Sequence, residues 1–468
     1  MTIKFGTDGW RGVIGVDFTR DRLIRVSQAL GQYALDKAKS PVRIMVGYDT
    51  RFMSAEFAQT AAEVLAGTGH EVWLTAKPVA TPVLSFAVRR WQAAAGLMVT
   101  ASHNPPKYNG VKFKGAYGGP LLPEEVAKIE KYLSYQPGSL TSGPASQNAK
   151  QLTVFNPDEP YLAQLSTLVK KETLASGNLK VVVDAMHGSA RGYVEEFLGP
   201  AGLSPAPCRN QINPSFGGLN PEPIEVNLDP LRQAVLASKA DVGVATDGDG
   251  DRLGAIDEHG RYVSAQQLFP LLLSHLVENR GWQGKVCKTF STTSRVDLVA
   301  AKYNLPVITT PIGFKYICEH FLTTEVLMGG EESGGFGFQK HLPERDGILS
   351  ALLLLELMAH KGKSLSTLLS GQEQEFGPHF YQRVDLEQAP VKPDGCSAVP
   401  TLASWLGIPL DAVSQMDGTK FTLQDGSWLL LRPSGTEPVL RLYAEAPSQE
   451  QVEQMLTWAR KVAGVENK

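Results

Sequence analysis

The chain has 468 residues, which is too long for a single hydrophobic core and indicates three or four domains. Hydrophobic residues make up 43% of the sequence and charged residues 20%, as is ordinary for a soluble globular protein. The formal net charge of −3 disfavours a protein that binds nucleic acid, because such a protein needs a broad basic face.

The sequence carries no signal for secretion or for a membrane span. The opening MTIKFGTDGWRG has no apolar core, and no run of about 18 apolar residues follows it. The four cysteines are scattered, without the spacing of a metal knuckle or of a disulfide framework. We therefore expect a cytoplasmic protein with reduced thiols and neither a membrane nor a nucleic acid partner.

Residues 1–145 are expected to form an α/β domain. Predicted strands alternate with predicted helices, in the order 22–38 (helix), 43–49 (strand), 54–69 (helix), 71–75 (strand), 81–91 (helix) and 93–100 (strand). This alternation predicts a mainly parallel sheet with helices on both faces. Ligands collect at the loops that leave the carboxyl ends of such strands, and TASHNPP (residues 100–106) is one of these loops.

Three more domains are expected after the polar connection at 135–150. Strand–helix alternation resumes over 151–257 and again over 258–371, which predicts two further α/β domains. In 372–468 strand-like segments with the hairpin signal QDGSW precede an amphipathic helix, a pattern typical of an α+β domain.

The last predicted strand of the first domain delivers Ser102 and His103 onto a loop stiffened by prolines. This placement suits a nucleophile that is held toward a substrate, and the alternative is a serine that only caps the loop. Lys112 follows ten residues later on an expected returning strand, close enough to carry a proton. A solvated lysine is the alternative, because lysine is rarely buried without a partner.

Three carboxylates alternate with glycines in DGDGDR, on a loop between two predicted strands. Asp247, Asp249 and Asp251 would form a compact oxygen cage for a hard divalent cation. An EF-hand is disfavoured because Arg252 stands where its turn needs glycine and because both flanks are strand-like. A polar turn is the alternative, but three such close carboxylates are costly without a cation or a basic partner.

Two later loops carry groups that suit a sugar phosphate. In RPSGTEPVLR, hydroxyl and N–H donors stand between two arginines, as expected of a phosphate site. In GEESGG, Glu331 and Ser333 can each take one of two adjacent sugar hydroxyls. The alternative for RPSGTEPVLR is a turn at a sheet edge, and the alternative for GEESGG is a solvated loop. Together with a nucleophile and a metal cage, these loops predict phosphoryl transfer on a sugar phosphate.

TASHNP, DGDGDR, GEESGG and RPSGTEP occur in the order, and roughly at the spacing, of the α-D-phosphohexomutases. The chain resembles this family over essentially its whole length, and FGTDGWRG resembles the family's N-terminal signature. The resemblance implies an α/β fold of three similar domains with mixed or parallel sheets, plus a C-terminal α+β domain. The four domains are expected to surround a central cleft, each contributing one loop, with the last domain mobile.

The resemblance also implies a role for each motif residue. Ser102 is expected to be the phosphorylated serine and to bind Mg²⁺ through a phosphoserine oxygen, together with Asp247, Asp249 and Asp251. The groups expected around that phosphate are Arg11, His103 and Arg252, with Lys112 as general acid or base. The expected substrate contacts are Lys315, Glu331, Ser333, Arg432, Ser434, Gly435, Thr436 and Arg441.

Smaller differences bear on the substrate. TPIGFK is similar to the TP-x-G-W-K of glucose-specific members, and GEESGG lacks the final histidine of the GExSGH form. These features favour interconversion of glucose 1-phosphate and glucose 6-phosphate through glucose 1,6-bisphosphate. The opening FGTDG is closer to bacterial glucosamine-type enzymes.

The alternatives are a phosphomannomutase, a phosphoglucosamine mutase, a glucose 1,6-bisphosphate synthase and a non-catalytic sugar-phosphate sensor. The expected partners are hexose phosphates, and the expected state is a monomer or a homodimer.

Overall fold

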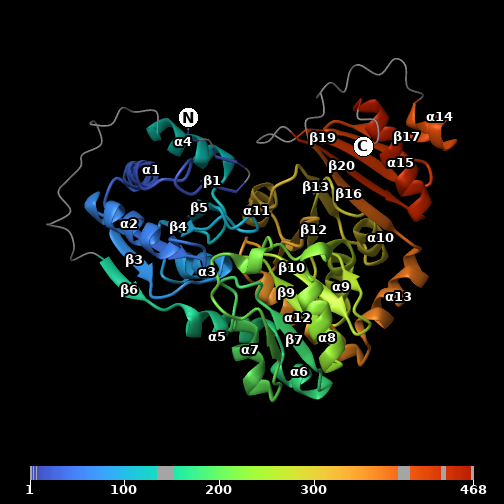
Figure 1. Ribbon diagram of the computed structural model, residues 1–468, viewed down its shortest axis with the longest axis horizontal. Helices are drawn as coiled ribbons and strands as arrows, with labels where there is room; N and C mark the ends of the chain where they lie inside the picture. Colours follow the sequence, from blue (N-terminus) through green and yellow to red (C-terminus); the bar gives the residue numbers. More distant parts are fainter. Residues whose placement is uncertain are drawn as a thin grey trace.

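Four β-sheets follow one another along the chain, each with its own helices. The computed structural model describes residues 3, 5–6, 8–133, 152–387, 401–433 and 439–464. Figure 1 shows the units in colour order, with the first (blue) on the left, the second and third in the middle and the fourth (red) at the upper right. The predicted fold of three α/β domains and a different C-terminal domain is confirmed.

The first sheet has six strands in the order β1-β5-β4-β2-β3-β6. Strands β2, β3, β4 and β6 run parallel, whereas β5 returns antiparallel to β4 and pairs with β1. The elements are β1 (Trp10–Val13), α1 (Arg20–Ala38), β2 (Arg43–Tyr48), α2 (Ser54–Gly67), β3 (Glu71–Thr75), α3 (Thr81–Arg90), β4 (Ala95–Val99), β5 (Tyr108–Gly115), α4 (Pro123–Leu133) and β6 (Leu152–Phe155).

Strand β4 shows why this sheet is apolar throughout. Leu97 and Val99 pack in one cluster with the side chains of α1 and α2, whereas Met98 packs with α3 on the opposite face. Side chains alternate between the two faces of a strand, so a strand covered on both faces must be apolar at every position. The sheet therefore presents its loops, not its faces, to a ligand.

The second sheet has the order β11-β10-β9-β7-β8, and the third has the order β13-β12-β14-β15. In the second sheet β9, β7 and β8 run parallel, β10 runs antiparallel to β9, and β11 runs antiparallel to β10. In the third sheet β13, β12 and β14 run parallel, and the edge strand β15 is antiparallel to β14. The elements of the second unit are α5 (Asp158–Leu168), α6 (Lys171–Gly177), β7 (Val181–Asp184), α7 (Tyr193–Leu198), β8 (Ala206–Cys208), α8 (Asp229–Ser238), β9 (Val242–Thr246), β10 (Leu253–Asp257) and β11 (Tyr262–Val263).

The third unit shares its core with the second through α12. Every residue of α12 from Gly347 to Met358 is buried, and its leucines join one cluster with residues of α5, α7 and α9. The elements are α9 (Ala265–Glu278), β12 (Lys285–Thr289), α10 (Arg295–Lys302), β13 (Val307–Thr310), α11 (Phe314–Thr323), β14 (Val326–Gly330), β15 (Phe336–Phe338), α12 (Gly347–Lys361) and α13 (Leu365–Phe376). A helix that is apolar all round is a buried helix, as found here.

The fourth sheet is entirely antiparallel, in the order β16-β20-β19-β18-β17. Leu429 and Leu431 pack with α15, whereas Trp428 and Leu430 on the other face pack against Phe290 of the third unit. The elements are β16 (Phe380–Glu387), α14 (Leu402–Leu406), β17 (Leu410–Ser414), β18 (Thr419–Leu423), β19 (Trp428–Pro433), β20 (Val439–Ala446) and α15 (Gln449–Val462). Of the helices in the described ranges, none combines the length and apolarity needed to cross a membrane.

Candidate active site

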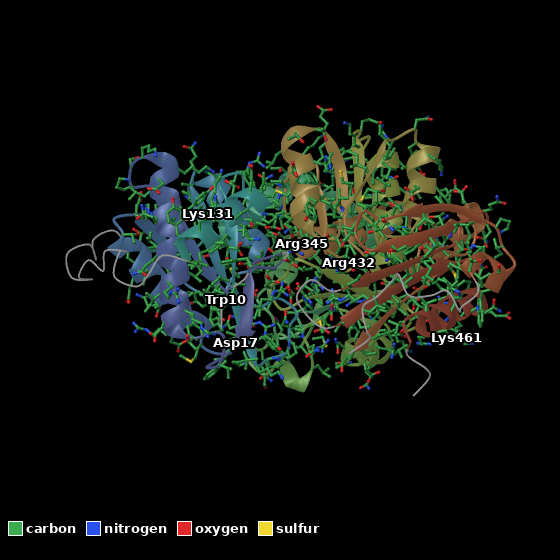
Figure 2. The ribbon with its side chains drawn as sticks, turned by 90° about the horizontal axis from the view of Figure 1, so that it is seen from above. Trp10, Asp17, Lys131, Arg345, Arg432 and Lys461 are labelled. Atoms are coloured by element: carbon green, nitrogen blue, oxygen red, sulfur yellow. The ribbon has the colours of Figure 1, made fainter. Side chains whose placement is uncertain are left out.

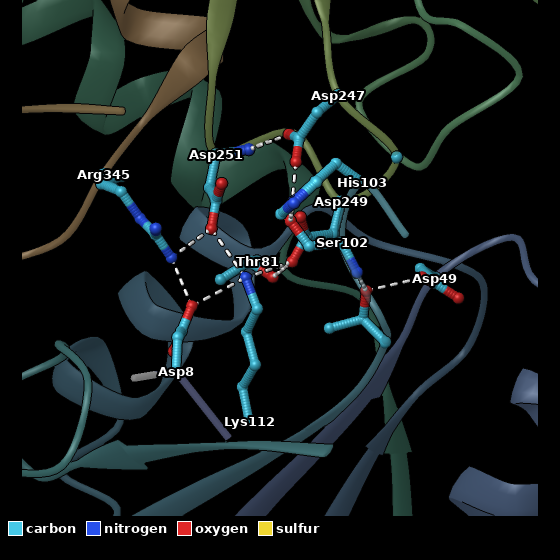
Figure 3. A network of polar contacts seen from close by, with 12 residues as sticks. Asp8, Asp49, Thr81, Ser102, His103, Lys112, Asp247, Asp249, Asp251 and Arg345 are labelled. Carbon is cyan, nitrogen blue, oxygen red and sulfur yellow. Dashed lines mark hydrogen bonds and ion pairs between the residues drawn. The ribbon is translucent and has the colours of Figure 1, made fainter. Parts of the chain in front are cut away.

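Ser102 is buried on the loop between β4 and β5, and its backbone is held in a conformation unusual for serine. Its φ is +52°, in the left-handed region, which costs a residue other than glycine about 1 to 3 kcal/mol. The Ser102 N–H donates to Thr100 Oγ1 at 2.8 Å, and the Ser102 hydroxyl donates to Asp247 Oδ2 at 2.8 Å. The side chain thus points at the aspartate loop of the second unit (Figure 3).

The aspartate loop, residues 247–252, connects the antiparallel strands β9 and β10. Asp247, Asp249 and Asp251 are fully buried, and each has a carboxylate oxygen within 4.8 Å of those of the others. Asp247 Oδ1 accepts the N–H groups of Asp251 and Arg252 at 2.9 and 3.2 Å, which fixes that carboxylate. The strands on both sides exclude an EF-hand.

The three aspartates fit a divalent cation. Asp249 Oδ1 and Asp251 Oδ1 are buried and have no hydrogen-bond partner among the residues that the structure describes. Burial, followed by the charges of Asp251 and Asp249, raises the pKa of Asp247 well above its usual range. Oxygen ligands left without donors and carboxylates that repel one another are both satisfied by a hard cation.

Lys112 lies on β5 and reaches the same carboxylates (Figure 3). Its side chain is 1% exposed, and Nζ lies 2.7 Å from Asp251 Oδ2, 2.8 Å from Asp249 Oδ2 and 3.0 Å from Asp8 Oδ2. Burial acts to lower the pKa of the ammonium, but Asp249, Asp251 and Asp8 outweigh it and raise the pKa. The alternative of a solvated lysine is excluded.

Cations and a neutral imidazole lie on the remaining sides of the Ser102 loop. His103 Nδ1 is 3.4 Å from the Ser102 hydroxyl, Arg11 Nη1 donates to Asn104 Oδ1 at 2.7 Å, and Arg252 Nη1 donates to Glu222 Oε1 at 3.0 Å. Burial, and then the charges of Arg252 and Arg11, lower the pKa of His103 well below its usual range. The imidazole is therefore neutral at pH 7.

Glu331 follows β14 on the GEESGG loop and joins the network through Arg345. Arg345 Nη1 donates to Glu331 Oε2 at 3.2 Å, and Arg345 Nη2 contacts Asp251 at 2.7 Å and also Asp8. Burial raises the pKa of Glu331 to about 7. Ser333 lies on the same loop, and Lys315, near the start of α11, lines a small pocket with Asp8.

The arginines of the RPSGTEPVLR segment lie on the fourth sheet. Arg432 Nε donates to Asp417 Oδ1 at 2.8 Å, and Arg441 Nε lies 3.6 Å from Asp385 Oδ2 on the neighbouring strand β16. In Figure 2, Arg432 and Arg345 lie toward the middle of the molecule, whereas Lys461 lies at the periphery of the fourth unit. Ser434, Gly435 and Thr436 lie outside the described residues.

Sequence reasoning did not single out several residues that complete the site. Asp8 belongs to the same GTDGWRG motif as Arg11, so the motif was noticed but its carboxylate was not. Arg345 lies two residues before the first residue of the apolar helix α12, and Thr81 begins α3 and donates to Asp249 Oδ2 at 2.5 Å. A polar residue at or just before the start of a buried helix is the signal that could have found the last two.

Comparisons with known proteins agree with this organisation. The chain matches four domain families in succession: phosphoglucomutase/phosphomannomutase alpha/beta/alpha domains I (residues 2–136), II (159–260) and III (264–376), and the C-terminal domain (397–458). A phosphoglucosamine mutase of Limosilactobacillus reuteri is 32% identical, with 100% of this chain and 99% of that protein covered. A phosphoglucomutase/phosphomannomutase of Thermococcus kodakarensis is 28% identical, with 97% and 96% covered.

A solved structure is also similar over the whole chain. The crystal structure of a protein from Thermus thermophilus, provisionally assigned as a phosphomannomutase, is 36% identical with a TM-score of 0.87, and 99% of each chain is covered. The chain therefore belongs to the phosphoglucomutase/phosphomannomutase family, the α-D-phosphohexomutases. It is accordingly an enzyme of the mutase type, an isomerase that moves a phosphoryl group within a hexose phosphate.

Proposed function

We propose that the enzyme interconverts glucose 1-phosphate and glucose 6-phosphate, with Ser102 as the phosphoryl carrier. Phosphoserine 102 gives its phosphoryl group to the free hydroxyl of the bound sugar phosphate, and the sugar hydroxyl loses its proton as the new P–O bond forms. The product is glucose 1,6-bisphosphate and an unmodified Ser102. The bisphosphate turns over in the site, and its other phosphoryl group returns to Ser102.

The single observation that carries this proposal is the contact of the Ser102 hydroxyl with Asp247 at 2.8 Å, beside two buried aspartate oxygens that lack donors among the described residues. A hydroxyl held against a cation site is placed to exchange a phosphoryl group, because catalysis of this transfer is mainly positioning and charge neutralisation. Mg²⁺, with Asp247, Asp249 and Asp251 as its ligands, would neutralise charge on the transferring group.

The surrounding side chains take the remaining tasks. We assign Arg11, His103 and Arg252 to the oxygens of the transferring group, and Lys112 to proton transfer. Glu331 and Ser333 would hold two sugar hydroxyls, with Lys315 beside them. The non-reacting phosphate would be held by Arg432, Ser434, Gly435, Thr436 and Arg441, where an arginine fork accepts the phosphate in either orientation of the sugar.

Glucose is the proposed sugar because TPIGFK and GEESGG are closest to the glucose-specific forms. Phosphoglucosamine mutase and phosphomannomutase are the second candidates, because relatives bear those names. The choice of sugar is tested by measuring turnover of glucose, mannose and glucosamine phosphates side by side, with and without added hexose bisphosphate. We expect the highest kcat/KM for glucose 1-phosphate, and a preference for glucosamine phosphate would overturn the assignment. Accumulation of free hexose bisphosphate in solution during turnover would indicate a bisphosphate synthase, which releases the intermediate.

The carrier role of Ser102 has its own test. After incubation with glucose 1,6-bisphosphate, intact-mass analysis should show one phosphoryl group on the wild type and none on Ser102→Ala. The variant should keep its melting temperature and lose isomerisation, because a carrier hydroxyl has no substitute. Absence of phosphate from the wild type would favour a sugar-phosphate sensor.

A further inference from the structure

A buried arginine, Arg51, lies behind the Ser102 loop and binds its backbone. The Arg51 side chain has no exposed surface, and its two terminal nitrogens donate to four carbonyl oxygens between residues 102 and 108. Nη2 donates to the carbonyls of Ser102 and Asn104, both at 2.6 Å, and Nη1 donates to those of Pro105 and Tyr108, both at 3.0 Å. One guanidinium thus ties together the backbone of the whole loop.

The geometry requires a planar guanidinium. Four carbonyls converge on one end of the side chain, and Nε lies 3.2 Å from Asp49 Oδ2 on the other side. Arginine offers five donors in a fixed plane, whereas a lysine ammonium offers three around a single point. A lysine at position 51 could keep the charge but could not serve all four carbonyls.

Asp49 supports the Ser102 N–H through the Thr100 hydroxyl. Its Oδ2 accepts from Thr100 Oγ1 at 2.6 Å, and Thr100 Oγ1 in turn accepts from the Ser102 N–H at 2.8 Å. Arg51 therefore binds the carbonyl of Ser102, while Asp49 and Thr100 bind its N–H. Both ends of the residue are fixed in the left-handed conformation that directs its hydroxyl at Asp247.

Residues of the second unit pack against Arg51 and Thr50. Arg51 lies 4.9 Å from the ring centroid of the buried Phe216, and Thr50 Oγ1 donates to the carbonyl of His187 at 2.8 Å. The unit that supplies the three aspartates therefore also packs on the guanidinium behind the serine. The position of Ser102 relative to those aspartates is fixed from both sides.

We propose that Arg51 is a positioning residue for phosphoryl transfer: it holds the strained Ser102 backbone so that the hydroxyl faces the aspartate site. This role rests on the proposed function of Ser102 as the phosphoryl carrier. Arg51 acts through the loop, and its substitution changes the rate of transfer at Ser102 more than it changes sugar-phosphate binding.

Arg51→Lys is the informative substitution, with Arg280→Lys as its matched control. The Arg280 side chain is only 9% exposed, pairs with one carboxylate (Glu356, 2.7 Å) and lies over an aromatic ring (Trp282, 5.7 Å). It binds the second and third units away from the Ser102 loop. Both variants lose a guanidinium that pairs with a carboxylate beside an aromatic ring. Only the first should alter the geometry at Ser102.

We expect Arg51→Lys to lower kcat by about 100-fold with KM changed less than about threefold, because a displacement near 1 Å at a reacting group has that effect. The rate at which glucose 1,6-bisphosphate phosphorylates Ser102, followed by intact mass, should fall in parallel. Millimolar guanidinium should partly restore this rate in Arg51→Ala and leave Arg280→Ala unchanged. Melting temperatures measured alongside separate these effects from loss of fold.

Two results would overturn the proposal. One is an Arg51→Lys enzyme with kcat within about threefold of wild type, since the loop would then hold its geometry without the guanidinium. The other is that kcat falls equally in Arg51→Lys and Arg280→Lys, and that the loss follows the decrease in melting temperature. Arg51 would then be a structural residue only. Failure of the wild type to phosphorylate Ser102 would instead refute the carrier role, and with it the role of Arg51.

Discussion

At the scale of single residues, the site is a set of buried charges that already pair with one another. Lys112 and Arg345 each bind Asp251 and Asp8, and Arg252 binds Glu222. Breaking such a buried pair leaves an uncompensated charge and is costly. A phosphoryl group on Ser102 adds a charge of about −1.5 to −2, so the arriving anion competes with Asp8 and Glu222 for the same cations.

Glu331 should give the enzyme a pH dependence near neutrality. Burial raises its pKa to about 7, so the side chain is neutral below that pH and becomes a carboxylate above it. The carboxylate accepts hydrogen bonds from sugar hydroxyls more strongly than the protonated acid does, because its acceptor oxygens are charged. We expect kcat/KM to increase as the pH rises through 7, measured with glucose 1-phosphate between about pH 5.5 and 8.5.

The control for this prediction is Glu331→Gln. This variant should lose the ionisation near pH 7 and about 10- to 100-fold in kcat/KM, as expected when hydrogen bonds to a charged group are lost. The substrate phosphate titrates near pH 6 with both enzymes, so it does not contribute to the difference between their pH profiles. An unchanged profile in Glu331→Gln would assign the ionisation to another group.

At the scale of elements, two helix N-termini converge on the aspartate loop. The Thr81 N–H at the start of α3 donates to the carbonyl of Asp249 at 2.7 Å, and the Gly347 N–H at the start of α12 donates to the carbonyl of Gly250 at 3.1 Å. Helix N-termini carry partial positive charge, which favours an anionic loop. The loop, the two helices and Lys112 come from three different units of the chain.

Because the site is assembled from three units, the sequence could predict only those parts of it that a local pattern encodes. The Gly-Asp pattern of DGDGDR and the strands beside it are local, so the loop and its carboxylates follow from the residues themselves. The partners of those carboxylates are distant, as Lys112 and Arg345 lie 139 and 94 positions from Asp251 by number. No local pattern encodes such contacts, and Arg51 was missed because its four acceptors are backbone carbonyls.

At the scale of the whole molecule, the alternation of strands and helices was enough to predict the fold class. The boundaries, the central cleft and the mobility of the last domain stay predictions. Strand β6 lies beyond residue 151 yet pairs with β3 of the first sheet, and β11 lies beyond residue 257 yet pairs with β10 of the second. Short strands carry little periodicity, so the sheet that they join depends on tertiary pairing.

The fourth unit meets the third through a polar contact that should control its docking. The buried Glu445 on β20 accepts from the Ser294 N–H at 2.8 Å, from the Ser294 hydroxyl and from Trp428 Nε1 at 3.0 Å. Beside it, Lys420 Nζ donates to the carbonyl of Phe290 at 3.0 Å and lies 3.7 Å from the Trp428 ring centroid. Removal of the Glu445 carboxylate leaves three donors at this interface without their acceptor.

We therefore expect Glu445→Ala to loosen the fourth unit from the third. Each buried donor left unsatisfied costs about 1 to 3 kcal/mol, enough to shift a docking equilibrium measurably. Small-angle scattering should show a larger radius of gyration, and KM should rise more than kcat falls, because the proposed phosphate arginines move away with the unit. Asp411→Ala, an exposed change on the edge strand β17, is the control and should alter neither quantity. If Glu445→Ala kept the wild-type scattering profile and KM, docking would depend on the apolar contacts of Phe290 and Trp428 instead.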